Sequence, residues 1–209
     1  MLKPSTTILF QGDSITNAFR MPEELNNAYQ LGAGYTLLIA SQLLATRPDD
    51  HLIFYNRGVA GEGICGLQQR WQADCLALTP DLLSILVGVN DAEPYLDVPA
   101  LPLDEYARVY RNLLQDTRRA LPEIRLVLCS PFLLNVAQPT KRGIAEIAAQ
   151  AEFVSVLADE FDAVYVPLYE EFTRACERAP SEYWSYDGIH PNAQGHWLIA
   201  QTWLEKVTV

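Results

Sequence analysis

The chain has few basic residues, and this shortage limits its partners. Of 209 residues, 15 are lysine or arginine and 26 are aspartate or glutamate, which gives a formal net charge of −11. Proteins bind nucleic acids and anionic membrane surfaces through basic patches that neutralise phosphate groups. We therefore expect no nucleic acid among the partners of this protein.

Long apolar runs are also missing. No apolar stretch approaches the roughly 18 residues that are needed to span a bilayer. The N-terminal sequence MLKPSTTILFQGDS has a single three-residue apolar stretch, which is too short for the hydrophobic part of a signal peptide. We expect no membrane insertion and a cytoplasmic location.

Cysteine is scarce, and its spacing predicts neither a zinc cluster nor a disulfide scaffold. The four cysteines, Cys65, Cys75, Cys129 and Cys176, form no C-x-x-C pair. Cys65 and Cys75 are expected on one helix, where ten residues correspond to about 15 Å, far beyond disulfide reach. We expect reduced structural cysteines and predict no metal and no cofactor.

What the sequence does contain is an alternation of two kinds of segment. Short apolar runs rich in β-branched and aromatic residues predict strands, and segments with helical spacing lie between them. The strands are expected at 6–11, 51–56, 82–88, 124–130 and 163–168, and the helices near 34–46, 64–78, 103–121, 141–161 and 192–206. This pattern predicts an α/β fold, a three-layer α/β/α sandwich with a doubly wound, five-stranded parallel sheet. The length fits one domain, residues 1–209.

The stretch ILFQGDSITN places a serine where the first strand ends. The apolar run stops at Gly12 and Asp13, and Ser14 follows. One interpretation is that Asp13 or Ser14 caps a helix with its side-chain oxygen. The other is a functional site, because ligands of such sheets bind outside the carboxyl ends of the strands.

Other strand ends carry the groups that a reactive serine needs. A serine hydroxyl requires a base, and the base requires a third group to orient it. His190 and Asp187 suit these roles, and the N–H of Gly58 and the amide of Asn90 could donate to an oxyanion. Each of these residues, taken alone, also fits an ordinary turn.

Taken together, four segments resemble the signature blocks of the GDSL, or SGNH, family of serine esterases. The segments are G-D-S at 12–14, Gly58, G-V-N-D at 88–91 and D-G-I-H-P at 187–191, and they occur in the family's order over nearly the whole chain. The resemblance implies a flavodoxin-like form of the three-layer fold and a carboxylic ester hydrolase.

The resemblance also implies a role for each residue of the blocks. Ser14 is the expected nucleophile, His190 the base and Asp187 the acid that orients it. The N–H of Gly58, the side chain of Asn90 and the N–H of Ser14 are the expected oxyanion hole. The chemistry is then hydrolysis through an acyl-enzyme.

Three longer stretches, 56–71, 78–92 and 183–204, look like the intracellular branch that includes carbohydrate acetylesterases. This likeness implies acetyl esters on carbohydrates, and so a small-molecule or oligosaccharide ester as substrate. A thioesterase, an arylesterase or a lysophospholipase with the same residues is the alternative. Glu93 and Pro94 replace the bulky aromatic or arginine found in many relatives, which leaves the substrate open. The resemblance also allows a homo-oligomer.

Three further residues are candidates to contact the substrate. Asp13 adjoins the serine, and Trp184 and Tyr186, together with Tyr183, form an aromatic group beside the last block. Aromatic rings of this kind can stack on a sugar, or they can simply cover the edge of the sheet.

Two other classes of protein compete with the esterase. Residues 61–66 match the G-x-G-x-x-G pattern of dinucleotide-binding proteins, but the acidic residue expected at the end of the next strand is missing, because Asp81 precedes that strand. A sugar-binding module that kept the fold without the reaction is the other competitor, since a fold alone does not establish activity.

Overall fold

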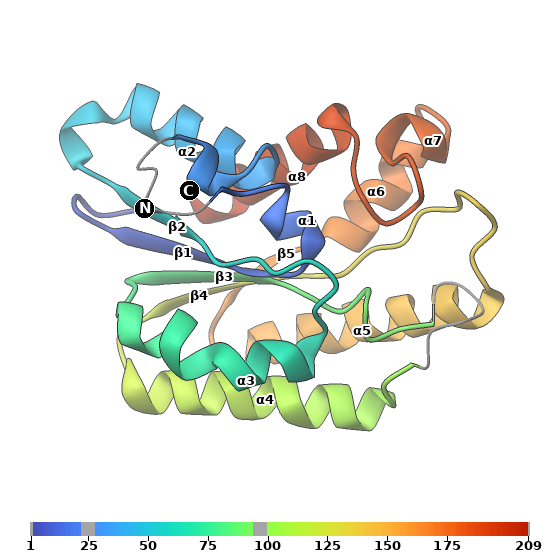
Figure 1. Ribbon diagram of the computed structural model, residues 1–209, viewed down its shortest axis with the longest axis horizontal. Coiled ribbons are helices and arrows are strands. Elements are labelled where there is room, and N and C mark those ends of the chain that lie inside the picture. The colour runs from blue at the N-terminus through green and yellow to red at the C-terminus, as the bar shows by residue number, and fades with distance from the viewer. Residues whose placement is uncertain (1, 22–27, 94–99, 209) are drawn as a thin grey trace.

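The protein contains one five-stranded parallel sheet (Figure 1). The computed structural model describes residues 2–21, 28–93 and 100–208. The strand order is β2-β1-β3-β4-β5, and every pair is parallel. This is the flavodoxin-like order, so the predicted fold class is confirmed. The strands are β1 (Thr7–Gly12), β2 (Ile53–Asn56), β3 (Leu82–Leu86), β4 (Arg125–Cys129) and β5 (Val164–Val166).

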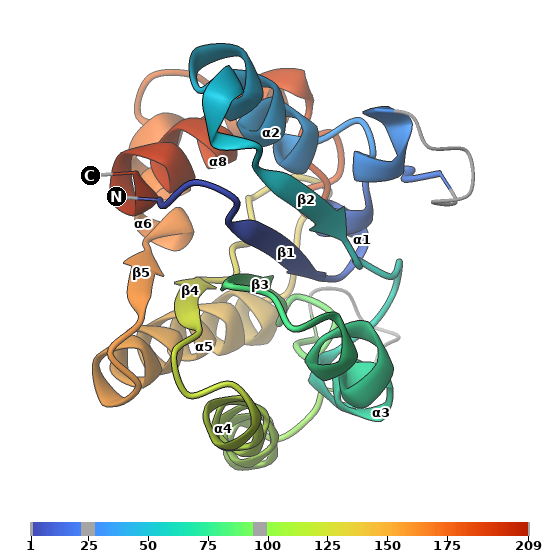
Figure 2. The same ribbon diagram turned by 90° about the vertical axis from the view of Figure 1, so that its left-hand side faces the viewer.

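Helices cover both faces of the sheet (Figure 2). α2 and α8 pack together on one face with α6 beside α8, whereas α3, α4 and α5 cover the other. The helices are α1 (Ser14–Asn17), α2 (Tyr35–Thr46), α3 (Ile64–Asp74), α4 (Leu103–Ala120), α5 (Lys141–Glu160), α6 (Leu168–Cys176), α7 (Ser181–Trp184) and α8 (Ala193–Val207), with 3₁₀ turns at Ala28–Leu31, Pro48–Asp50 and Leu76–Leu78.

The interior strand β1 divides its side chains between the two helix layers. Successive side chains of a strand point to opposite faces, so an apolar run can fill two cores at once. Ile8 and Phe10 belong to one core cluster and Leu9 to the other. Phe10 contacts Tyr35 of α2 and Trp203 of α8, with ring centroids 5.8 and 5.6 Å apart. β1 is therefore fixed on both faces, and its carboxyl end is a rigid support.

Most predicted segments match the structure to within two residues at each end, and two differences affect the elements that follow. The strand expected at 163–168 is shorter, because Leu168 already begins α6, a helix that the sequence analysis did not predict. The helix expected at 64–78 ends at Asp74, and a 3₁₀ turn follows. Cys75 thus lies just beyond the helix that carries Cys65, and all four cysteines are unbridged.

None of the helices in the described part of the chain is both long enough and apolar enough to cross a membrane.

Candidate active site

Ser14 and His190 meet at the carboxyl edge of the sheet. The hydroxyl oxygen of Ser14 lies 2.8 Å from Nε2 of His190, although 176 positions separate the two residues. Nδ1 of His190 lies 2.6 Å from Oδ2 of Asp187. The structure therefore brings together, in one continuous line of contacts, the three residues that the sequence analysis assigned to nucleophile, base and acid.

Asp187 and His190 are held in place by a tight turn. Oδ1 of Asp187 accepts the backbone N–H groups of Ile189 and His190, at 2.9 and 2.7 Å, which leaves Oδ2 for the imidazole ring. Gly188 has φ of +93°, a conformation that favours glycine. Partial burial alone would raise the pKa of Asp187, but the bonds from His190 and Ile189 outweigh it and lower the pKa below its usual value. The carboxylate is thus ionised and oriented.

Ser14 is the first residue of α1, directly beyond the end of β1 (Figure 1). Asp13 caps this short helix, because its Oδ1 accepts the N–H of Ile15 at 2.9 Å. The capping interpretation of Asp13 is therefore correct, and it coexists with the contact between Ser14 and His190. Asp13 is only 1% exposed. This burial raises its pKa to about 7, although the Ile15 N–H and the nearby His190 act in the opposite direction. A side chain so enclosed does not fit the predicted contact with substrate.

Gly58 does not offer its N–H group to the site. The N–H donates to Oδ1 of Asn56 at 2.9 Å, and its position is fixed by close packing, since a Cβ would lie 2.4 Å from the backbone nitrogen of Asn17. The family resemblance predicts this N–H in the oxyanion hole, which does not agree with its bond to Asn56. In the structure Gly58 instead serves the contact between the end of β2 and α1.

Asn90 lies against a different part of the same loop. Its Nδ2 donates to the carbonyl oxygen of Glu62 at 3.0 Å. Gly61, one residue earlier, is exposed, has φ of +79° and has open space where a Cβ would be. A turn with the N–H of Glu62 donating to the carbonyl oxygen of Val59 accounts for this conformation. Gly61 thus adjoins in sequence the residue that Asn90 contacts, and the sequence marks it only as part of the dinucleotide pattern.

The carboxylate of Asp91 caps the N-terminus of α3. Both of its carboxylate oxygens accept the N–H of Ile64, at 3.0 and 2.9 Å. Burial raises the pKa of Asp91 to about 7, against the effect of the Ile64 N–H. A dinucleotide-binding protein holds its pyrophosphate at the corresponding helix N-terminus. A carboxylate in that position argues against the dinucleotide interpretation.

A sequence model of the GDSL-like lipase/acylhydrolase family matches residues 10–198. The chain belongs to this family. It is a carboxylic ester hydrolase. The family match therefore favours the esterase over the alternative of a sugar-binding module without activity.

Known relatives of this esterase have the same fold. A putative GDSL-like lipase from Parabacteroides merdae is 38% identical, with a TM-score of 0.94 over 100% of this chain and 98% of that one. An acetylxylan esterase from Geobacillus stearothermophilus is 29% identical over 208 residues, 96% of this chain and 93% of the relative. The solved structure of Axe2, an acetylxylan esterase from the same organism, is 26% identical, with a TM-score of 0.90 over 99% of this chain and 96% of the other. Variants of Axe2 described as catalytic mutants replace a serine, an aspartate and a histidine.

The aromatic residues near His190 divide into two groups. Tyr186 is 62% exposed and its ring stacks on the ring of His190, with centroids 5.7 Å apart. Tyr183 is also exposed. Trp184, in contrast, is buried, and its indole N–H donates to the carbonyl oxygens of Ala175 and Ala179. Trp184 therefore covers the core of the esterase, which does not fit its predicted contact with substrate, whereas Tyr186 borders the site.

The remaining segment of interest follows the G-V-N-D block. The backbone N–H of Glu93 donates to the carboxylate of Glu146, and the carboxylate of Glu93 pairs with Arg142. Glu146 and Arg142 both belong to α5. Pro94 lies outside the described residues.

Within residues 2–21, 28–93 and 100–208, no three His, Cys, Asp or Glu side chains are grouped so as to hold a metal ion.

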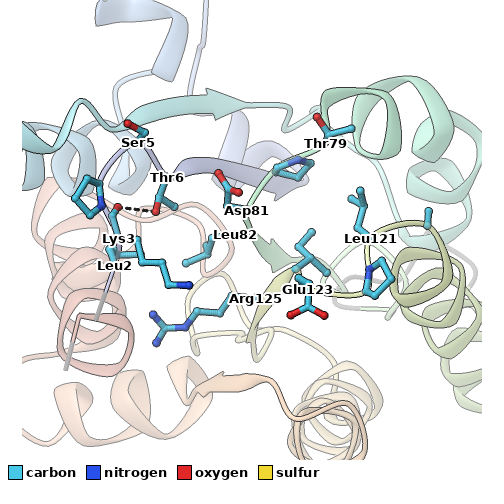
Figure 3. A pocket seen from close by; sticks show the side chains of 15 residues that line it. Leu2, Lys3, Ser5, Thr6, Thr79, Asp81, Leu82, Leu121, Glu123 and Arg125 are labelled. Atoms are coloured by element: carbon cyan, nitrogen blue, oxygen red, sulfur yellow. Dashed lines mark hydrogen bonds between the residues drawn. The ribbon is translucent and has the colours of Figure 1, made fainter.

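A cavity of about 590 Å³ lies away from these residues (Figure 3). Its lining includes Thr6, Leu82 and Arg125, which stand at the amino ends of β1, β3 and β4. The cavity is therefore at the edge of the sheet opposite to Ser14, and it plays no part in the contacts described above.

A second histidine near the site makes the stability of the esterase depend on pH. Nδ1 of His196 accepts the N–H of Tyr35 at the start of α2, at 3.3 Å, which requires the neutral ring. Burial, and then the charge of His190, lowers the pKa of His196 from 6.5 to about 4. Between pH 4 and 6.5 the unfolded chain binds a proton at this residue that the folded chain does not. The contribution of His196 to the free energy of unfolding is therefore greatest above pH about 6.5 and falls as the pH is lowered toward 4.

We expect His196→Asn to remove this pH-dependent contribution, which is about 3 kcal/mol for the shift in pKa from 6.5 to about 4. The thermal unfolding temperature is measured from pH 4 to 7.5 for both proteins, and their difference isolates His196 from the buried carboxyl groups. The unfolding temperature of the unaltered protein minus that of the variant should be greatest near neutral pH and decrease on acidification. A difference that is constant across the range would contradict the assignment.

Proposed function

We propose that this esterase removes acetyl groups from carbohydrates by nucleophilic catalysis at Ser14, as a cytoplasmic enzyme acting on acetylated oligosaccharides. The observation that carries the proposal is the line of contacts from Ser14 to His190 to Asp187, at 2.8 and 2.6 Å. A nucleophile bonded to a base that is itself oriented by a carboxylate is the arrangement that acyl transfer requires.

The expected reaction has two halves. The oxygen of Ser14 attacks the ester carbonyl carbon while Nε2 of His190 takes the hydroxyl proton, and Asp187 stabilises the resulting imidazolium. The tetrahedral intermediate then expels the sugar alcohol, which receives that proton from His190. In the second half His190 takes a proton from water, and the hydroxide attacks the carbonyl carbon of acetyl-serine. The bond to the Ser14 oxygen breaks, that oxygen takes the proton from His190, and acetic acid leaves and ionises to acetate in water.

The negative charge on the carbonyl oxygen requires hydrogen-bond donors that are already in place. Asn90 is one, since its amide has two N–H groups and the bond to Glu62 uses one of them. The N–H of Ser14 is another, because N–H groups in the first turn of a helix have no acceptor within the helix. We assign the third donor to Gly61 rather than Gly58, because Gly61 adjoins the residue that Asn90 contacts and the N–H of Gly58 is already bonded to Asn56.

The choice of acetylated carbohydrate rests on two supports. The relative from Geobacillus stearothermophilus that matches 96% of this chain is an acetylxylan esterase. In addition, Tyr186 exposes its ring beside His190, and an exposed aromatic ring next to a reactive group can stack on a sugar.

The test is a panel of p-nitrophenyl esters and acetylated xylo-oligosaccharides. We expect kcat/KM to fall about tenfold or more from acetyl to butyryl esters, because extra methylene groups in a pocket shaped for an acetyl group would cost about 1–3 kcal/mol. Acetate should be released from the oligosaccharides, with the Ser14→Ala protein as the blank. If octanoyl esters or acyl-CoA thioesters are cleaved faster than acetyl esters, the carbohydrate substrate is wrong and a lysophospholipase or thioesterase takes its place.

A further inference from the structure

The side chain of Arg70 lies between β1 and the loop that precedes α3. From α3, its Nε donates to Glu62 at 2.6 Å and its Nη1 donates to Oε1 of Gln11 at 2.8 Å. Its Nη2 donates to the carbonyl oxygen of Gly12 at 3.3 Å, and Nη1 also reaches Asp74 at 3.2 Å. One guanidinium group therefore contacts two consecutive residues of β1, a loop residue and its own helix.

The surroundings of this side chain make its contacts stronger than those of a surface arginine. Its side chain is 15% exposed, and those of its partners Glu62 and Asp74 are 22% and 32% exposed. Charge-assisted hydrogen bonds that are partly shielded from water are about twice as strong as neutral ones. Gln11 is fully buried and also donates to the carbonyl oxygen of Asp74 at 2.6 Å. The group is thus a closed network with few alternative positions.

This network connects the segment that carries the nucleophile to the segment that adjoins the oxyanion donors. Gly12 ends β1, two residues before Ser14. Glu62 adjoins Gly61, and its carbonyl oxygen accepts the bond from Asn90. The distance between the nucleophile and the oxyanion donors is therefore set by the segments that Arg70 joins.

We propose that Arg70 is a positioning residue that fixes the Gly61–Glu62 segment relative to Ser14 for the reaction. This inference rests on the proposed function, because it assumes that the segment supplies an oxyanion donor. Arg70 does not touch the reacting atoms. It acts through the two segments, and a displacement of about 1 Å in such a site can cost about 100-fold in rate.

Arg70→Lys is the variant that separates charge from geometry. Lysine keeps the positive charge, but its three donors leave from one atom and cannot reach β1 and the loop together. We expect kcat for p-nitrophenyl acetate to fall about 10- to 100-fold with KM changed less than about twofold, because the lost alignment matters in the transition state and not in substrate binding.

The rate is expressed per active site, counted by the final extent of labelling with a fluorophosphonate. This count removes any misfolded protein from the comparison. Arg119→Lys is the matched control, since Arg119 pairs with Asp116 on the exposed surface of α4, where its side chain is 77% exposed, and its kcat should equal that of the unaltered enzyme. If Arg70→Lys lowers only the unfolding temperature, or raises only KM, Arg70 is a structural or binding residue and the inference is overturned.

Glu62→Gln provides a second, independent measurement. It removes the charge at the loop end of the network and leaves the carbonyl oxygen that Asn90 contacts. We expect the double variant with Arg70→Lys to have nearly the kcat of Arg70→Lys alone, because the two changes break one connection. Effects that simply multiply would overturn the inference. A normal kcat for Arg70→Lys beside an inactive Ser14→Ala protein would overturn this inference alone, whereas an active Ser14→Ala protein would overturn the proposed function as well.

Discussion

Ser14→Ala is expected to reduce kcat for p-nitrophenyl acetate by on the order of 10⁴- to 10⁶-fold, because no other group in the line of contacts can attack the ester carbonyl. The loss should be confined to chemistry. The hydroxyl of Ser14 contacts His190 at the rim of the site, whereas the packing of β1 depends on residues such as Ile8 and Phe10. The thermal unfolding temperature should therefore stay close to that of the unaltered enzyme.

Ser41→Ala is the matched control, since Ser41 is exposed on α2. It should leave both kcat and the unfolding temperature unchanged. A fluorophosphonate should label the Ser41→Ala protein and fail to label the Ser14→Ala protein. If Ser14→Ala retains more than about a tenth of kcat, which corresponds to less than about 1.4 kcal/mol of barrier, Ser14 is not the nucleophile.

Asp187→Asn is expected to give the second-largest loss, about 10³- to 10⁴-fold in kcat. An amide in place of the carboxylate favours the tautomer of His190 with its proton on Nε2, and that nitrogen then cannot accept the hydroxyl proton of Ser14. The backbone bonds from Ile189 and His190 to Oδ1 can be kept by the amide oxygen, so the turn should keep its shape.

Kinetics with p-nitrophenyl acetate check this result, and Asp159→Asn on the exposed side of α5 is the control. We expect KM to change little in both proteins. A fall of less than about tenfold for Asp187→Asn would mean that the carboxylate contributes to the structure of the turn and little to the orientation of the base.

The fold could be predicted because apolar runs that fill two cores leave a clear pattern. β1 and β3 are buried along nearly their whole length, and both were located within one or two residues. β5 has only three residues, and the helix that follows it begins at Leu168, after Pro167. No change of hydrophobicity marks that boundary, because the last residue expected in the strand is the first apolar residue of the helix.

The candidate site was predictable only in part, and its exceptions have physical reasons. Ser14, Asp187 and His190 stand in short segments whose chemistry is visible in the residue types. The choice between Gly58 and Gly61 depends on where each N–H group points, and both residues are glycines in the same loop. The bond from Gly58 to Asn56 comes from the three-dimensional structure alone.

The substrate contacts were the least predictable. Trp184 and Tyr186 are two positions apart in the sequence and both are aromatic, yet one is 8% and the other 62% exposed. Trp184 is the last residue of the short helix α7 and bonds to Ala175 of α6, whereas Tyr186 lies beyond that helix and stacks on His190. Arg70 could not have been singled out either, because an arginine on an amphipathic helix ordinarily faces solvent.

The 176-residue separation between Ser14 and His190 has a consequence for how activity appears during refolding. The turn that orients His190 is built from local bonds, but its contact with Ser14 closes nearly the whole chain, and contacts of such high sequence separation form late. β1 can pair with β3 and pack Leu9 against α3 and α4 before α8 has docked on the opposite face. Recovery of ester hydrolysis should therefore follow the slowest folding phase, after most of the far-ultraviolet circular dichroism signal has returned.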